Sequence, residues 1–291
     1  MHGFEEVMIT GKNVADAVFL DLESFFFYAS KFKVAREYTD QARENASYVG
    51  SGNNARIKMS GELRNYDANS LARVFLVAIV VCHECAHYLN RHNDFVDNDE
   101  MDFMAIENWA DYFGARIFGV IITFGKNTQK IMKKIDPQLD QEMVLKEIGG
   151  ALGDIYRHIY LQNTDPRYSP AIDRVRLFNA GFTSFFYRLF GELKPGFTVD
   201  VLLKIGRAAS LSDELGTKDV AWDKQSAAAK KMGQIHQKIQ GKQPAITLGL
   251  KPRYIPLLVT NYHLSGDEIK ANKQILMNQV ERIGIKVDWE L

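Results

Sequence analysis

The sequence of 291 residues is poor in cysteine and has no excess of charge of either sign. Only Cys82 and Cys85 occur, whereas a structural zinc ribbon needs about four such ligands, so that kind of site and a disulfide scaffold are both excluded. Lys and Arg together number 36, and so do Asp and Glu, so no net charge attracts nucleic acid or an anionic membrane. We therefore expect neither as a partner, and the oligomeric state stays open.

Long hydrophobic runs and a secretory signal are also missing from the sequence. The longest apolar runs, residues 74–81 and 117–124, fall well short of the roughly 20 residues that span a bilayer. The first residues, MHGFEEVMITGKN, lack the basic and then apolar layout of a signal peptide. These features predict a cytoplasmic protein without a membrane span.

The first part of the chain has a mixed pattern. Residues 7–10 and 55–60 resemble short strands that could form a small sheet. Between them, residues 14–45 place aromatic and aliphatic side chains at intervals of three and four, as on a buried helix face. Residues 48–54 are rich in Gly, Ser and Asn and predict a loop.

Helical periodicity dominates the middle of the chain. Residues 66–89 predict a helix that is apolar nearly all round and so belongs at the centre of the molecule. Three more helices are predicted over residues 99–118, 137–162 and 171–189. The last hundred residues contain a Lys- and Gln-rich stretch, 218–242, and short β-like runs around Ile246, 255–259 and 285–289. Together these patterns predict an α+β fold that is mostly helical.

The motif His83-Glu84-Cys85-Ala86-His87 lies late in the apolar helix. His83 and His87 are one helical turn apart on the same face, so both imidazoles can reach one metal ion. Zinc is suited to two imidazoles and a carboxylate, with a fourth position left for water. Glu84 lies on an adjacent line of the helix, where it can accept a proton from that water as general base.

A third ligand is available in Glu107, 20 positions after His87. Asp111 follows four residues later on the same helical face and can accept a hydrogen bond from the second nitrogen of a ligating imidazole, in the first place His83. Two acidic side chains at this spacing repel each other unless a cation lies nearby. The predicted zinc ligands are therefore His83, His87 and Glu107, with Asp111 behind them.

Other interpretations of these residues are less favourable. The two histidines could be ordinary core residues and the acidic pair a solvated helix face, but Glu84 is costly to bury between them without a metal. His92 falls one position short of the third histidine of metzincins, so we expect it at the surface. Cys82 and Cys85 are interleaved with the motif, which favours buried small side chains over a redox pair.

At this point the sequence resembles the gluzincin metallopeptidases, through His83, Glu84, His87, Glu107 and Asp111. Within that group it is most similar to the Lit family of phage-exclusion peptidases, which share the apolar helix, an E-x-x-A-D helix (here ENWAD) and a later LQNT-x-P segment at residues 161–166. The resemblance covers roughly residues 66–180. It implies a zincin-like core around a central HExxH helix, and a zinc endopeptidase that cleaves an intracellular protein in phage defence.

The third segment departs from the family pattern. Related peptidases often have His-Pro before a downstream arginine, whereas Asp165 occupies the histidine position here and Arg174 follows at a longer spacing. The resemblance makes Arg174 the candidate catalytic residue that steadies the site or the oxyanion. Arg167, Tyr168 and His158 are the alternatives.

We therefore expect a metallopeptidase domain over residues 1–190 and an accessory region of unassigned role over residues 191–291. The rival hypothesis is a binding or regulatory module with the same fold and a largely structural metal. Glu84 favours the enzyme, because a structural site has no need of a general base.

Overall fold

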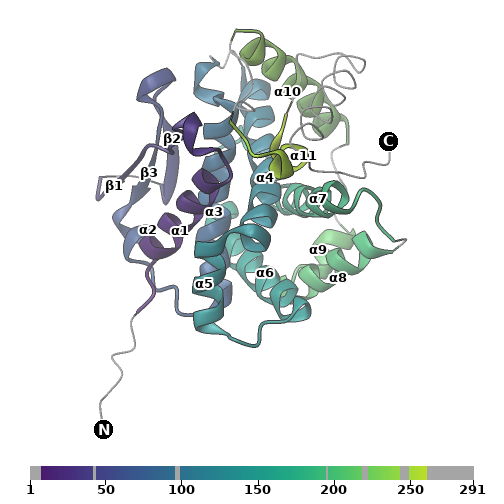
Figure 1. Cartoon of the computed structure of the whole chain (residues 1–291). Helices are drawn as coiled ribbons and strands as arrows, with labels where there is room; N and C mark the ends of the chain where they lie inside the picture. Colours follow the sequence, from purple (N-terminus) through teal and green to yellow (C-terminus); the bar gives the residue numbers. More distant parts are fainter. Residues whose placement is uncertain are drawn as a thin grey trace.

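The computed structural model describes residues 8–41, 44–95, 99–194, 196–217, 222–242 and 249–260. Over these residues the fold is α+β and mostly helical, as predicted, with a small sheet beside α1 and α3 and with α7, α8 and α9 on the opposite side (Figure 1). The helices are, in chain order, α1 (Gly11–Ser24), α2 (Gly61–Asn65), α3 (Leu71–Asn90), α4 (Glu100–Phe124), α5 (Lys126–Ile135), α6 (Gln141–Ile155), α7 (Ala171–Phe190), α8 (Phe197–Ala209), α9 (Ser212–Thr217), α10 (Trp222–Lys242) and α11 (Ile255–Leu258).

The sheet has the strand order β1-β3-β2, so β2 lies at an edge. Strand β1 (Arg36–Thr39) runs parallel to β3 (Arg56–Ser60), and β2 (Ala46–Val49) runs antiparallel to it. Strand β3 confirms the strand predicted at residues 55–60. The predicted loop at 48–54 is wrong at its start, because its first two residues pair with β3 as the end of β2.

The helix predicted over residues 14–45 is wrong beyond Ser24, where α1 ends. The chain that follows pairs with a distant segment instead. The Phe27 N–H donates to the Gly249 carbonyl at 2.7 Å, and the Lys251 N–H donates to the Phe25 carbonyl at 2.9 Å. These two hydrogen bonds join segments more than 200 residues apart and hold the chain between α1 and β1. The spacing of apolar residues in the local sequence does not indicate such a long-range contact.

Two predicted strands are not strands in the structure. Over the described residues 8–10, Thr10 caps α1 by accepting a hydrogen bond from the Asn13 N–H, and it forms only an isolated bridge with Asp67. The run at 255–259 forms the short helix α11, with a proline in its first turn, where the missing N–H costs nothing. The runs at Ile246 and at 285–289 lie outside the described residues.

Helix α3 is the central helix, as predicted for residues 66–89. Ser70 caps its start, and Arg91 ends it in a left-handed conformation. Helix α3 is long and apolar enough to cross a membrane, but so are the central helices of many globular folds. In this fold, 67% of its most apolar stretch is buried against other parts of the chain. The predicted helices that follow are confirmed as α4, α6 and α7, with shifted ends.

Two glycines let α4 pack closely against its neighbours. A Cβ at Gly114 would lie 2.9 Å from the Cα of His83, so α3 and α4 touch backbone to backbone at the first histidine of the motif. A Cβ at Gly181 on α7 would overlap the carbonyl oxygen of Tyr112 on α4. The position of α4 is thus fixed on both sides.

We expect Gly181→Ala to lower the free energy of unfolding by about 1–3 kcal/mol, the usual cost of overpacking, because backbone atoms must move apart. Gly150→Ala is the matched control on α6, since its Cβ would meet only Ala72 Cβ at 3.5 Å. That variant should gain up to about 1 kcal/mol, the difference in helix propensity. Urea denaturation of both variants measures the effect, and equal stabilities would contradict the close contact.

The described part of the C-terminal region packs on the helices around α3. Helix α8 lies against α6, and α10 lies against α4. The contact between α10 and α4 has a small core of its own, formed by Ala105, Ile106, Ala228, Met232, Ile235 and Ile239. The Lys231 ammonium on α10 also lies 2.9 Å from the buried Asp102 carboxylate on α4. One face of the Lys- and Gln-rich stretch is therefore buried.

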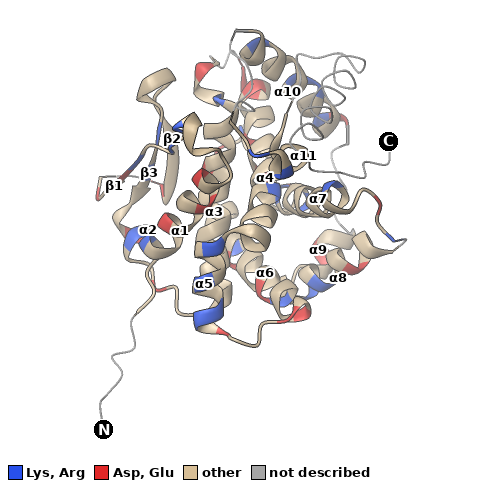
Figure 2. Ribbon diagram, viewed as in Figure 1, with Lys and Arg blue, Asp and Glu red and all other residues tan. Residues whose placement is uncertain are grey.

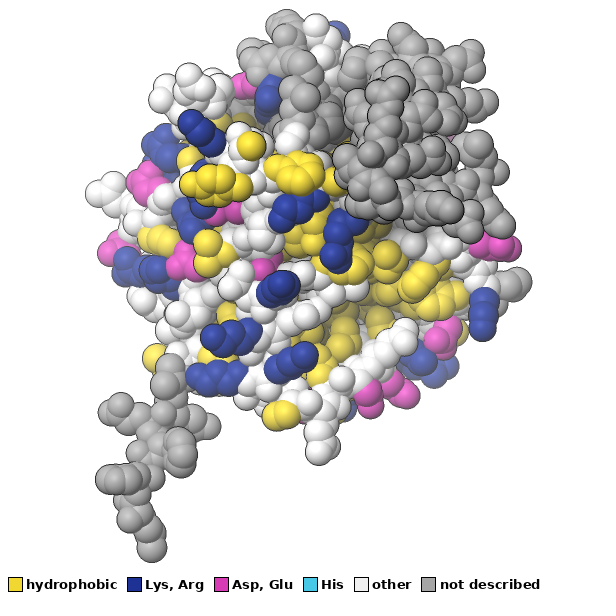
Figure 3. Space-filling model, viewed as in Figure 1, with side chains coloured by type: hydrophobic (Ala, Val, Ile, Leu, Met, Phe, Trp, Pro, Cys, Tyr) yellow, Lys and Arg dark blue, Asp and Glu magenta, His cyan; other side chains and the backbone are white. Residues whose placement is uncertain are grey.

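The surface carries charges of both signs (Figure 2), with lysines gathered on α5. Figure 3 shows hydrophobic side chains over α7, where Tyr187 and Phe190 are more than half exposed. No histidine is visible among the described residues on that face. Of the motif histidines, His87 is buried, and His83 is partly buried with 17% of its side chain exposed.

Candidate metal centre

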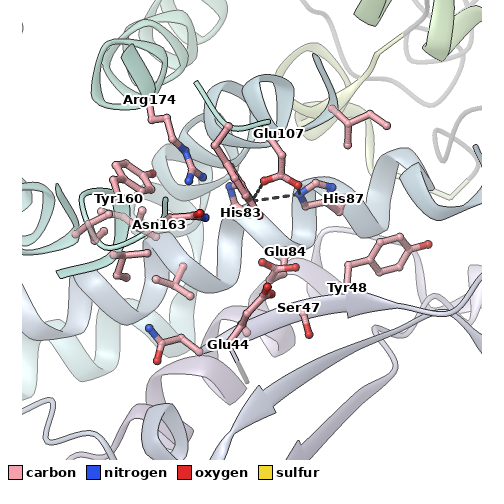
Figure 4. A pocket seen from close by; sticks show the side chains of 18 of the residues that line it. Glu44, Ser47, Tyr48, His83, Glu84, His87, Glu107, Tyr160, Asn163 and Arg174 are labelled. Carbon is pink, nitrogen blue, oxygen red and sulfur yellow. Dashed lines mark hydrogen bonds and ion pairs between the residues drawn. The ribbon is translucent and has the colours of Figure 1, made fainter. Parts of the chain in front are cut away.

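Three possible metal ligands meet where α3 and α4 pack together (Figure 4). The Nε2 atoms of His83 and His87 are 3.1 Å apart. Glu107 places one carboxylate oxygen 3.4 Å from His83 Nε2 and the other 3.5 Å from His87 Nε2. This group could hold a metal ion, as the sequence predicted.

The packing of the two helices explains why these residues meet. His83 and His87 share one face of α3 because they are four residues apart. On α4, Glu107 precedes Gly114 by seven residues, which is two turns, so both lie on the face that touches α3. The missing side chain at Gly114 brings that face close enough for the carboxylate to reach both imidazoles.

Asp111 holds His83 from behind, as predicted. The His83 Nδ1 lies 3.0 Å from Asp111 Oδ1. Asp111 is itself held by Arg174, which donates two hydrogen bonds of 2.7 and 2.9 Å, and by the Tyr160 hydroxyl at 3.2 Å. Burial alone would raise the pKa of Asp111, but Arg174 and His83 outweigh it and hold that pKa well below its usual range. Asp111 is therefore an anion that accepts the Nδ1–H of His83 and directs Nε2 towards His87 and Glu107. Burial alone would lower the pKa of His83, but Asp111 and Glu107 raise it to about 10, so a metal ion would replace a proton on Nε2.

The segment that supports Asp111 is unusual. Helix α6 continues into a π-helical turn, Tyr156–Tyr160, and this wider turn carries the tyrosine that reaches Asp111. π-Helical turns are rare and are frequently found at functional sites. The Arg174 guanidinium lies 4.0 Å from the Tyr160 ring centroid and 4.9 Å from that of Tyr168.

The four candidates for the oxyanion differ in position. Three of them line the cavity in front of the ligands: Arg174, Tyr168 and His158. Arg174 donates two hydrogen bonds to Asp111. Arg167 does not line that cavity. Its guanidinium is bonded to Asp165 and lies over the Phe103 ring.

We expect Asp111→Asn to weaken zinc binding by roughly 10- to 100-fold, because a neutral amide no longer raises the basicity of His83. Asp173→Asn is the matched control, since Asp173 is also buried and ion-paired with an arginine but is not among the residues that line the cavity. Both variants lose a buried ion pair, so both should be less stable. Zinc competition assays in which the two variants bind equally would contradict the role of Asp111.

Glu84 lies in the same cavity and is only 8% exposed (Figure 4). Burial raises its pKa to about 7, although the charge of His83 and a hydrogen bond from the Tyr48 N–H on strand β2 oppose the rise. A carboxyl group with a pKa near neutrality can both take up and release a proton. The cavity itself has a volume of about 840 Å³ and runs along β2.

His92 is not at the surface, contrary to expectation. The left-handed turn at Arg91 leads into a 3₁₀ turn, His92–Asp94, which folds His92 back behind the end of α3, where it is only 2% exposed. Its Nδ1 lies 2.8 Å from the Nδ1 of His87, and its Nε2 lies 3.1 Å from the Nε2 of His236 on α10. Burial lowers the pKa of His87 to about 4 and that of His236 to about 3, so these imidazoles are neutral.

His236 was not anticipated from the sequence. A weak signal existed, because it adjoins apolar residues at helical spacing on α10: Ala228, Met232, Ile235 and Ile239. Only the fold shows that this face meets His92. The two cysteines are buried and free, as predicted.

No protein-family model, curated protein or solved structure matches this chain. The resemblance to gluzincins therefore rests on the motif residues themselves.

Proposed function

We propose that this chain is a zinc-dependent endopeptidase of the gluzincin type, with a zincin-like core, that hydrolyses peptide bonds of an intracellular protein. The observation that carries the proposal is the position of Glu84, a buried carboxyl group beside three convergent metal ligands in one cavity. A purely structural zinc site would be closed and would not need such a group.

The donor set fits zinc. With Zn–N and Zn–O distances of about 2.0–2.1 Å, ligands in a tetrahedral site lie about 3.3–3.4 Å apart. The two imidazole Nε2 atoms are 3.1 Å apart, and Glu107 places one oxygen 3.4 Å from His83 and its other oxygen 3.5 Å from His87. One ligand atom from each residue lies within 4.8 Å of the others, so small side-chain shifts are enough to complete the set. Bound there, zinc would lower the pKa of a water molecule towards neutrality and polarise a peptide carbonyl.

The side chains around the ligands have separate roles in this proposal. Glu84 takes the proton of the attacking water at its carboxylate and returns it to the departing amine. Arg174 acts through Asp111, because two of its donors are bound there. Tyr168 is the better candidate for the oxyanion: burial and then the charges of Glu107 and other carboxylates raise the pKa of its hydroxyl, which keeps it a hydrogen-bond donor in the cavity.

Strand β2 supports a peptide as the substrate. Tyr48 turns its N–H towards Glu84, and its carbonyl accepts a hydrogen bond from Asn93, so both groups point away from β3. Two residues earlier, Ala46 has the same orientation by strand alternation and lines the cavity. Because the backbone groups of Tyr48 are already bonded, an extended peptide could pair with this edge at Ala46 and so pass in front of the ligands. The resemblance to the Lit family suggests a protein of the phage-infected cell as the natural substrate.

The proposal is tested with purified protein loaded with one equivalent of zinc. An extract of growing cells and one of phage-infected cells are incubated with the protein, and new N-termini are labelled and identified by mass spectrometry. We expect a small set of new N-termini that a zinc chelator abolishes. Full zinc loading without any new N-terminus in either extract would favour the rival hypothesis, a binding or regulatory module.

A further inference from the structure

Two histidines outside the motif extend the ligand His87 into a row of imidazoles. His87, His92 and His236 are joined by nitrogen–nitrogen contacts of 2.8 and 3.1 Å, and the last two residues are 144 positions apart in the sequence. His92 and His236 are 2% and 0% exposed. The row therefore connects α10 to a candidate metal ligand on α3 through the interior.

The direction of these hydrogen bonds decides whether His87 can bind a metal. A neutral imidazole carries one proton, so His87 can offer the Nε2 lone pair only if Nδ1 carries the hydrogen. His87 Nδ1–H then donates to His92 Nδ1. His92 in turn carries its hydrogen on Nε2 and donates to His236 Nε2. In the opposite direction His87 would have its hydrogen on Nε2, facing Glu107 and His83, and could not be a ligand.

His236 is held in place by the packing of α10 against α4. The apolar contact between α10 and α4 surrounds it. The Trp109 ring on α4 packs edge-on against its imidazole, with the two ring centroids 5.0 Å apart. At the start of α10, Gln225 accepts a hydrogen bond from Asn108, the neighbour of the ligand Glu107. The same two helices therefore place His236 and Glu107.

We propose that His92 and His236 are positioning residues of the metal centre: they hold His87 in the tautomer and orientation that bind the ion. This inference rests on the metal site of the proposed function, but not on its peptidase activity. It gives α10, in the region to which the sequence assigned no role, a part in metal binding. The carboxylate of Asp111 accepts the Nδ1–H of His83, whereas the neutral imidazole of His92 accepts the Nδ1–H of His87.

The experiment compares paired variants by zinc competition with a chromophoric chelator. His92→Phe keeps a ring of similar size without an acceptor, whereas His92→Asn places an amide oxygen near the position of Nδ1. We expect His92→Phe to lose roughly 10- to 100-fold in zinc affinity, as when the partner of a ligating histidine is removed, and His92→Asn to recover most of it. His236→Phe should lower the zinc affinity less than His92→Phe does. His236→Gln, which places an amide oxygen near the position of Nε2, should restore it.

His158→Phe is the control, because His158 lines the cavity but lies outside the ligand group. The thermal midpoint of each metal-free variant separates a structural effect from a metal effect. Equal zinc affinities for His92→Phe and His92→Asn would overturn the proposal. So would losses of zinc affinity that only parallel the loss of stability of the metal-free variants. If His92→Phe does not fold, the His236 pair decides by the same criterion. Zinc affinity that depends on these residues in a protein that cleaves nothing would leave this inference standing and remove the peptidase.

Discussion

Glu84→Gln is expected to bind zinc as wild type does and to lose peptide hydrolysis by about 10²- to 10⁴-fold, the usual contribution of a general base. Glutamine has the shape of glutamate, and its amide oxygen can still accept the Tyr48 N–H that now bonds Glu84. It cannot take a proton from water at neutral pH. Because Glu84 is not one of the three convergent ligands, the metal should stay.

The measurement pairs zinc content with cleavage of the substrate found in the extract experiment. Glu62→Gln is the matched control, since Glu62 lines the same cavity and undergoes the same chemical change. Its activity should stay close to that of wild type. Loss of zinc from Glu84→Gln would make Glu84 a ligand, and equal loss of activity in both variants would point to the charge of the cavity instead of a base.

The residues of the site could be predicted because their relations are local. His83 and His87, like Glu107 and Asp111, are four residues apart within one helix, and helical geometry alone puts each pair on one face. Helix α3 was predictable for a similar reason, since its apolar residues extend nearly all round it. The distance between the two pairs could not be predicted. It depends on Gly114, which lets α4 approach the backbone of His83.

The origin of β1 and the burial of His92 and His236, all missed from the sequence, involve contacts between distant segments. Strand β1 and the end of α1 depend on the pairing of residues 25–27 with 249–251. His92 fails to match any histidine spacing and was assigned to the surface, but a left-handed turn at Arg91 buries it. Its partner His236 comes from the Lys- and Gln-rich stretch, to which no role was assigned from the sequence. The spacing of apolar residues within either segment does not indicate such contacts.

His83→Ala is expected to abolish stoichiometric zinc binding, whereas His158→Ala should leave it intact. The first variant removes one of three ligands and leaves only His87 and Glu107, too few to compete with a chelator for the ion. The fold should survive, because Asp111 keeps its two hydrogen bonds from Arg174. His158 offers the same residue type in the same cavity, but it lies outside the ligand group.

Stability gives a second measurement of the same prediction. A ligand that binds only the folded state stabilises it by about 2.7 kcal/mol at a hundred times its dissociation constant. Zinc should therefore raise the unfolding temperature of wild type and of His158→Ala, and a chelator should reverse the shift. His83→Ala should unfold at one temperature whether zinc or chelator is added. A zinc-dependent shift that persists in His83→Ala and disappears in His158→Ala would place the metal elsewhere in the cavity, and it would remove the geometric basis for Glu84 as the base.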